Sequence, residues 1–134
     1  MNTENDNIFL YDTKQQTKIK QLEAKKLSVF DLVPLDSILL HTKLKEFDFQ
    51  NPPVNPNEFA SSLVETCRKL NGLGLSANQC GFPHRVFVIG SNDSYIACFN
   101  PKIISVDGET HMEEGCLSFP LLTLKITRPK KITV

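Results

Sequence analysis

The feature that most constrains the fold is a well-bounded amphipathic segment over residues 56–70. Asn55 is a favourable N-cap, Pro56 takes the first helical position, and Glu58 stands where a capping box has its acidic residue. Apolar residues then recur at helical spacing on one face, namely Phe59, Leu63, Val64, Cys67 and Leu70. Gly72 follows at the position where a left-handed residue commonly ends a helix. The sequence therefore predicts one helix with one buried face.

Short runs of β-branched and aromatic residues follow this helix. Turn-forming residues separate them, and we expect strands over residues 85–89, 95–99, 102–106 and 122–126. One helix packed on short antiparallel strands is an α+β domain. A chain of 134 residues has room for one hydrophobic core of ordinary size.

The region before the helix divides into two parts. Residues 1–26 are rich in Asn, Gln, Thr and Lys, which predicts a loosely ordered polar extension. Residues 27–40 regain apolar side chains around a proline, so we expect an extended stretch followed by a turn. Residues 51–56 have the composition of a loop. The domain is therefore expected over residues 27–134.

Composition restricts the classes of partner. Fifteen basic residues balance fifteen acidic ones, so no overall charge draws the chain to nucleic acid or to anionic lipid. No apolar run reaches the roughly 20 residues of a membrane span, and the polar N-terminus lacks the layout of a signal peptide. We therefore expect a cytoplasmic protein whose cysteines stay reduced, namely Cys67, Cys80, Cys98 and Cys116.

Residues 72–79 form a glycine-containing stretch that does not fit a nucleotide site. The dinucleotide fingerprint needs a further glycine or alanine opening a helix after a strand, whereas here the helix comes first. Gly72 and Gly74 instead allow the backbone to approach a ligand closely, and Gln79 offers an uncharged hydrogen-bond donor. A helix stop followed by an ordinary loop is the alternative interpretation.

Cys116 lies between Gly115 and Leu117, with Pro120 four positions further on. Glycine permits a tight approach and proline interrupts regular strand pairing, so the thiol is expected at an irregular strand edge. A cysteine at such an edge can face a cleft. A structural thiol is the alternative when the motif is considered alone.

Taken together, residues 72–79 and 113–120 resemble two of the three signature motifs of peptide deformylase. They occur in the family's order with strands between them, and the resemblance runs from about residue 32 to Val134. Ser76, where alanine is usual, and Phe119, where a smaller aliphatic residue is frequent, are mild departures from the motifs. The resemblance implies a peptide deformylase-like α+β fold and a metallohydrolase that removes the formyl group from N-formylmethionine on nascent polypeptides.

The resemblance also implies the reacting groups. Cys116 would bind the catalytic metal, which by family resemblance is Fe²⁺ and is replaceable by Zn²⁺, Ni²⁺ or Co²⁺. That ion would lower the pKa of its bound water. The Gln79 carboxamide and the Leu117 backbone amide would hold the oxyanion that forms on the formyl oxygen.

Five further positions receive roles from the same resemblance. Gly72, Gly74 and Leu75 would hold the peptide backbone of the substrate. Glu114 and Arg128 would be scaffolding residues behind the site rather than reacting groups.

The family's third motif, His-Glu-x-x-His, is absent from this chain. Its histidines are His41, His84 and His111, and none has another histidine four residues away. His111 precedes Cys116 by five positions and is kept as a candidate second ligand. Because Val134 falls inside an apolar and basic stretch that reads as a strand, we expect a domain truncated before its C-terminal metal-binding helix.

Whether this chain alone is an enzyme is therefore open, and three hypotheses follow. The first is a deformylase whose metal-binding helix is missing or comes from a complementing C-terminal polypeptide. The second is a non-catalytic relative that binds formyl-methionyl peptides or partners at the ribosome exit. The third is a small cytosolic thiol protein outside the family.

Overall fold

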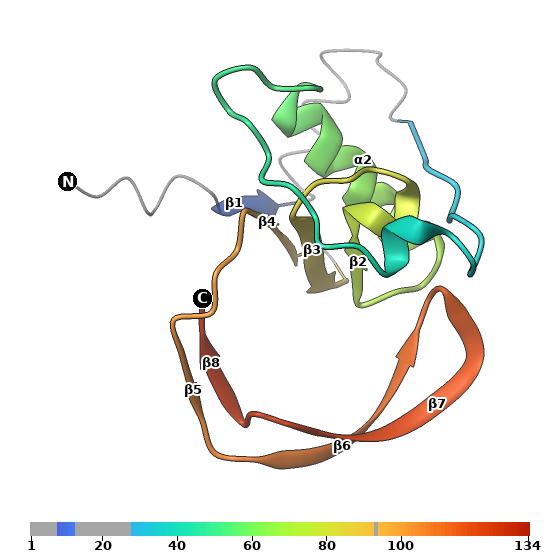
Figure 1. Cartoon of the computed structure of the whole chain (residues 1–134), viewed down its shortest axis with the longest axis vertical. Helices are drawn as coiled ribbons and strands as arrows, with labels where there is room; N and C mark the ends of the chain where they lie inside the picture. Colours follow the sequence, from blue (N-terminus) through green and yellow to red (C-terminus); the bar gives the residue numbers. More distant parts are fainter. Residues whose placement is uncertain (1–7, 13–27, 93) are drawn as a thin grey trace.

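The computed structural model describes residues 8–12, 28–92 and 94–134 (Figure 1). Within them lie one α-helix, two 3-10 helices and eight short strands, so the predicted α+β fold is confirmed. The elements in chain order are β1 (Ile8–Asp12), η1 (Ile38–Leu40), α2 (Pro56–Lys69), β2 (Gly74–Ser76), η2 (Ala77–Cys80), β3 (Val86–Ser91), β4 (Ser94–Phe99), β5 (Ser105–Asp107), β6 (Thr110–Cys116), β7 (Phe119–Arg128) and β8 (Lys131–Thr133).

The predicted start of α2 is confirmed. Asn55 Oδ1 accepts hydrogen bonds from the backbone N–H groups of Asn57 at 3.0 Å and Glu58 at 3.1 Å. Pro56 stands at the first turn, where its missing N–H costs nothing.

No helix in the described ranges has the length and apolar character that a membrane span needs.

The end of α2 differs from the prediction in one respect. The left-handed residue is Asn71, with φ of 56°, and not Gly72. The Gly72 N–H still closes the helix by donating to the Cys67 carbonyl at 2.9 Å. A glycine is needed at position 72 for space, because a Cβ there would lie 2.6 Å from Leu117 Cδ1.

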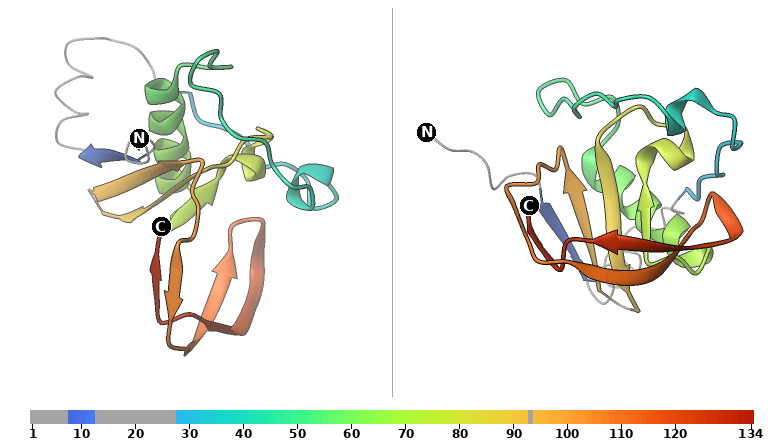
Figure 2. Two further views of the ribbon diagram at one scale, coloured as in Figure 1. Left: turned by 60° about the vertical axis from the view of Figure 1, so that its left-hand side comes forward. Right: turned by 60° about the horizontal axis from the view of Figure 1, so that its bottom comes forward.

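Four strands form an antiparallel sheet in the order β1-β4-β3-β2. Strands β3 and β4 confirm the strands expected over residues 85–89 and 95–99. Strand β1 lies inside the extension expected to be loosely ordered, and it pairs with β4 from Ile8 opposite Cys98 to Asp12 opposite Ser94. Helix α2 packs on one face of this sheet (Figure 2).

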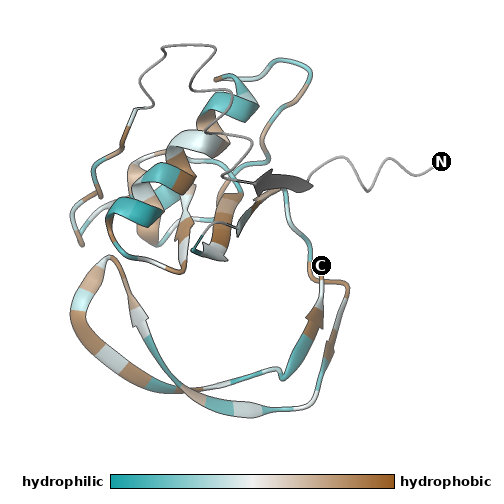
Figure 3. Cartoon of the chain, turned by 180° about the vertical axis from the view of Figure 1, so that it is seen from behind, coloured by the Kyte–Doolittle hydropathy of each residue, from teal (hydrophilic) through white to brown (hydrophobic). Residues whose placement is uncertain are grey.

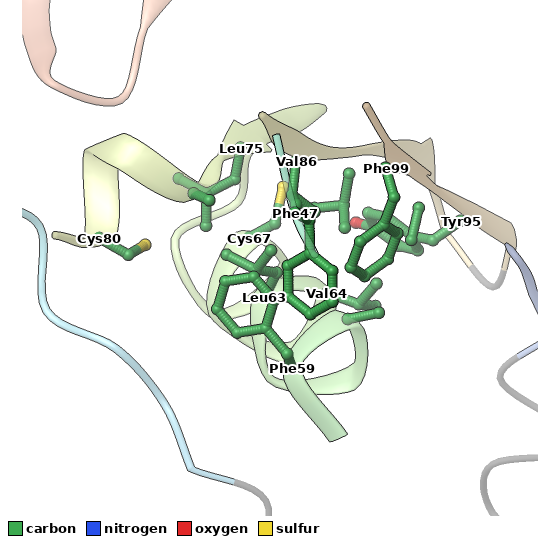
Figure 4. Close-up of a cluster of buried hydrophobic side chains, with 14 residues drawn as sticks. Phe47, Phe59, Leu63, Val64, Cys67, Leu75, Cys80, Val86, Tyr95 and Phe99 are labelled. Carbon is green, nitrogen blue, oxygen red and sulfur yellow. The ribbon is translucent and has the colours of Figure 1, made fainter. Parts of the chain in front are cut away.

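The hydrophobic core lies between α2 and the sheet (Figure 4). Phe47 is central to it, since its ring meets Phe99 edge-on at 4.9 Å and stacks on Phe59 at 6.3 Å. The predicted apolar face of α2 is buried at Phe59, Leu63, Val64 and Cys67. Burial of these side chains is the main source of stability in this part of the fold.

The C-terminal region forms two further antiparallel pairs, β5 with β8 and β6 with β7. These hairpins arch away from the sheet as a thin ribbon (Figures 1 and 2). The strands expected over residues 102–106 and 122–126 correspond in part to β5 and β7, whereas β6 was not predicted. Apolar residues, coloured brown, recur along this ribbon (Figure 3). Many apolar residues of the C-terminal region are exposed, including Ile104, Val106, Met112, Leu121, Leu122, Leu124 and Ile132.

Candidate functional site

Cys116 ends β6 at an irregularity of the strand pairing. The register with β7 shifts between Gly115 and Cys116, so the prediction of an irregular strand edge is confirmed. The Cys116 thiol is exposed, whereas the other three cysteines are buried. Burial raises the pKa of those three thiols, and it raises the pKa of Cys80 to about 12. Cys116 is therefore the accessible thiol of the described part of the chain.

Gln79 lies in η2 and turns its side chain toward Cys116. Its Oε1 accepts a hydrogen bond from the Ser76 backbone N–H at 2.9 Å, and its Nε2 donates to Ser118 Oγ at 3.0 Å. The same Nε2 lies 3.7 Å from Cys116 Sγ, across a separation of 37 positions in the sequence. The predicted convergence of Gln79 and Cys116 is confirmed, and their chemical roles stay predictions.

Leu117, whose backbone amide is the second candidate oxyanion donor, is held against the end of α2. Its half-buried side chain packs against the hydrophobic core. It also fills the space beside Gly72, where a Cβ would be 2.6 Å from Leu117 Cδ1 and 3.2 Å from Cys67 Sγ. The Cys67 thiol in turn donates to the Gly72 carbonyl at 3.3 Å. Gly72, in the first motif, thus leaves the space in which Leu117, the residue after Cys116, is held.

Strand β2 is an edge of the four-stranded sheet and lies beside this site. The Gly90 N–H donates to the Leu73 carbonyl, and Leu75 pairs with Val88. In an antiparallel ladder, alternate residues direct their backbone groups toward the partner strand. The backbone groups of Gly74 therefore point away from β3, toward the open edge. The Leu75 side chain is buried at 2% exposure, so its predicted contact with a substrate stays a prediction.

Glu114 and Arg128 form a two-point ion pair across the β6–β7 hairpin. Arg128 Nε and Nη2 donate to the two carboxylate oxygens of Glu114 at 2.9 and 2.7 Å. The Arg128 hydrogen bonds hold the pKa of the Glu114 carboxyl below its usual range. The pair links β6 to β7 two residues before Cys116, and its scaffolding role stays a prediction.

The residues present do not by themselves fit a catalytic metal. Such a site needs about three protein ligands and an open position. No group of three or more His, Cys, Asp or Glu side chains in the described ranges is arranged to hold an ion. His111 is not a partner for Cys116, since it binds Thr127 Oγ1 at 2.9 Å and lies five residues away along β6, about 16 Å at the usual strand rise.

Sequence reasoning missed two residues that organise the site. The Ser76 backbone N–H and the Ser118 hydroxyl together orient the Gln79 carboxamide. Ser118 is buried at 8% exposure. A signal existed, because a serine directly after Cys116-Leu117 stands in an otherwise apolar run, but spacing alone cannot show which side chain a hydroxyl meets.

Comparison with known proteins gives a consistent picture. The polypeptide deformylase family profile matches residues 29–134. The peptide deformylase of Thermotoga maritima is 42% identical over 73 residues, which are 54% of this chain and 44% of that protein. The peptide deformylase of Elusimicrobium minutum is 33% identical over 118 residues, covering 81% of this chain and 67% of that protein. The chain spans about half the length of the Thermotoga relatives it matches, 44% in each case.

Solved structures agree with the sequence relatives. The crystal structure of peptide deformylase from Thermotoga maritima matches with a TM-score of 0.69 and 29% identity, covering 78% of this chain and 71% of that one. A peptide deformylase from Legionella pneumophila matches with a TM-score of 0.67 and 29% identity, covering 78% of this chain and 63% of that one. The likeness therefore extends from the sequence motifs to the fold that carries them.

Proposed function

This chain belongs to the peptide deformylase family, and from that premise we propose that residues 27–134 form the oxyanion-binding and peptide-binding part of a deformylase. Members of this family act on formylated nascent peptides and typically use a catalytic metal. The proposed reaction hydrolyses the amide bond between a formyl group and the N-terminal methionine of a nascent polypeptide. The products are formate and a free amino terminus, and the proposed location is the cytoplasm.

The approach of Gln79 to Cys116 is the observation that carries this proposal. When water-derived oxygen attacks the formyl carbon, negative charge develops on the formyl oxygen. The Gln79 Nε2, 3.7 Å from Cys116 Sγ, and the Leu117 backbone N–H beside it are two donors available to that oxygen. Removing one such donor in a preorganised site typically slows a reaction by about 10²–10³-fold.

The open edge of β2 supports the peptide-binding part of the proposal. The outward backbone groups of Gly74 suit pairing with an extended peptide, which would add to the sheet beside β2. A side chain at Gly72 would meet Leu117 and one at Gly74 would lie 3.2 Å from the Val88 carbonyl, so the proposed contacts of both glycines with a peptide are through their backbone groups. The formyl end of such a peptide would then lie near Gln79 and Cys116, because η2 follows β2 directly in the chain.

Cys116 Sγ is proposed as the one metal ligand from this part of the chain. By family resemblance the ion is Fe²⁺, replaceable by Zn²⁺, Ni²⁺ or Co²⁺. We propose that its other ligands come from a complementing segment or polypeptide that packs on the exposed apolar residues near the site. Leu73, 72% exposed, and Leu121, fully exposed, are members of that surface. We also propose the ribosome exit region as a partner.

The alternative, a non-catalytic relative that binds formyl-methionyl peptides, is not favoured, because the curated relatives that match are named as the enzyme. The third hypothesis, a thiol protein outside the family, is wrong, since the family match covers residues 29–134.

Peptide binding tests the proposal without requiring turnover. We expect formyl-Met-Ala-Ser to shift the Leu117 amide and the Gln79 side-chain amide in an NMR titration of the 134-residue chain. Unformylated Met-Ala-Ser, the matched control ligand, should leave both signals near their free positions. Equal shifts with both peptides, or shifts confined to other residues, would refute the assignment of the site.

Turnover tests the complementing segment. The chain alone is expected to show no deformylase activity and to hold well under one equivalent of iron, zinc or nickel, because the described residues supply one family ligand. Addition of a peptide helix bearing His-Glu-x-x-His, with metal, should produce turnover that Cys116→Ala abolishes. Turnover by the unsupplemented chain above a metal-only control, lost in Cys116→Ala, would contradict the expectation that the chain alone is inactive.

A further inference from the structure

The sense of the Gln79 carboxamide is fixed by a group that can only donate. The Ser76 backbone N–H lies 2.9 Å from one terminal atom of this side chain, which must therefore be the oxygen. The nitrogen then faces Ser118 and Cys116. A flipped amide would set two donors against each other at Ser76, so its donor end stays on the side of Cys116.

The direction of the nitrogen's two hydrogens needs a second restraint. Ser118 Oγ provides one, because it accepts from Nε2 at 3.0 Å. With the oxygen held at Ser76 and one N–H held at Ser118, the plane of the carboxamide is fixed. The remaining N–H then has one direction available, on the side where Cys116 Sγ lies 3.7 Å away.

Water cannot readily take over the role of the Ser118 hydroxyl. Ser118 is 8% exposed, whereas the neighbouring Cys116 is exposed. Loss of a buried acceptor leaves its donor unsatisfied, which costs more than the bond contributed when both partners were present. A change at Ser118 should therefore be felt at Gln79.

Ser118 also directly follows Leu117 in the chain. One short turn between β6 and β7 therefore carries both the Leu117 N–H and the hydroxyl that orients Gln79. The separation between the two proposed oxyanion donors is set by this turn and by the Gln79–Ser118 hydrogen bond that fastens it to η2.

We propose that Ser118 is a positioning residue that fixes the direction and spacing of the Gln79 donor relative to the Leu117 amide, an inference that rests on the proposed oxyanion-binding function of both groups. Ser118 need not touch the substrate. Its hydroxyl acts through Gln79, and its loss removes one of the restraints on the carboxamide: the oxygen stays at Ser76, but the direction of the N–H groups is less fixed while the backbone of the site stays in place.

The experiment compares three variants of the full chain with the unchanged protein. Ser118→Ala removes the acceptor, Ser118→Thr keeps a hydroxyl, and Ser105→Ala is the matched control on exposed β5. The first readout is hydrogen exchange of the Gln79 side-chain amide, assigned by loss of its signal in Gln79→Ala. We expect exchange to rise about tenfold in Ser118→Ala, to recover in Ser118→Thr, and to stay unchanged in Ser105→Ala.

The second readout is the preference for formyl-Met-Ala-Ser over Met-Ala-Ser, which should fall about tenfold in Ser118→Ala with the backbone spectrum of α2 unaltered. Unchanged exchange of the Gln79 amide in Ser118→Ala would overturn the inference. Equal loss in Ser118→Ala and Ser118→Thr would also overturn it, because packing rather than the hydroxyl would be responsible. No preference for the formyl peptide in the unchanged chain would overturn the proposed function instead, and amide exchange would still decide the role of Ser118.

Discussion

The part of the fold built on α2 and the four-stranded sheet differs sharply from the C-terminal hairpins. Among the residues whose burial the structure describes, 28–92 and 94–134, the fully buried apolar side chains all belong to residues 47–99, whereas β5, β7 and β8 are almost wholly exposed. The candidate site lies at the junction of these two regions. Gln79 comes from the packed region and Cys116 from the hairpins, so its geometry depends on the few contacts that join them.

The two regions contribute differently to the rigidity of this site. The packed region fixes Gln79 through η2 and the adjoining sheet, because its neighbours cannot move without opening the core. The hairpins have hydrogen-bonded strands but bury few side chains. Cys116 is therefore held in place mainly by its two neighbours: Leu117 packs beside Gly72, and Ser118 accepts a hydrogen bond from Gln79. Changes at the junction should therefore affect the site more than changes along the rest of the ribbon.

The largest effect is expected from a matched pair of leucine substitutions. Leu63→Ala leaves a cavity in the core and should lower the free energy of unfolding by about 2–5 kcal/mol. Leu121→Ala removes a fully exposed side chain and should change it by less than about 0.5 kcal/mol. Urea denaturation followed by circular dichroism measures both, and similar losses would break the contrast between the regions.

Gly72→Ala tests the junction directly. Its Cβ would lie 2.6 Å from Leu117 Cδ1, so Leu117 must move, and we expect a loss of about 1–3 kcal/mol together with a shift of the Leu117 amide signal. Gly115→Ala is the matched control on the hairpin, because its Cβ would meet Leu122 O at an ordinary 3.8 Å. If both variants behave alike, contact with Gly72 does not hold Leu117.

Thiol labelling sharpens the comparison between the regions. At pH 8 iodoacetamide should add one equivalent to the folded chain, at Cys116, since the other thiols are buried. With its pKa raised to about 12, Cys80 would be about one part in ten thousand thiolate at that pH. Peptide mass spectrometry locates the label. Fast labelling of Cys67 or Cys80 in the native protein would show that the core opens easily.

The smallest effect is expected at the Glu114–Arg128 pair. Because this pairing holds the pKa of Glu114 below its usual value, its contribution is present above that usual value and is lost as pH falls through the lowered one. Glu114→Gln should therefore lower the melting temperature slightly at pH 7 and by less at pH 3. Glu113→Gln is the control, since its contact with Lys125 is a long 3.9 Å. Equal effects of Glu114→Gln at both pH values would argue against the pair.

The sequence predicted the elements whose signals are local. The cap at Asn55, the apolar face of α2 and the β-branched strands β3 and β4 all lie where their patterns indicate. Strand β6 was missed because its residues are polar and small, and its strand character comes from pairing with β7. Strand β1 was missed for a different reason, because its short apolar run, Ile8 to Tyr11, lies inside a stretch whose composition is polar overall.

The candidate site was predictable as a set of residues but not as a geometry. The two motifs identified Gln79 and Cys116, and the roles implied by the family resemblance required them to meet at one site. Ser118 orients Gln79, and Gly72 leaves room for the Leu117 side chain. Both roles depend on contacts between segments far apart in sequence, which no local pattern encodes. The same limit explains why His111 remained a candidate ligand until its place along β6 was known.

Nuclear Overhauser effects from the Gln79 side-chain amide would show whether the packed region and the hairpins meet to build one site. We expect cross-peaks from these amide protons to the Hβ protons of both Cys116 and Ser118 in the folded 134-residue chain, since Nε2 lies 3.7 Å from Cys116 Sγ and 3.0 Å from Ser118 Oγ. A Gln79 amide that shows water exchange and no cross-peak to either residue would contradict this expectation.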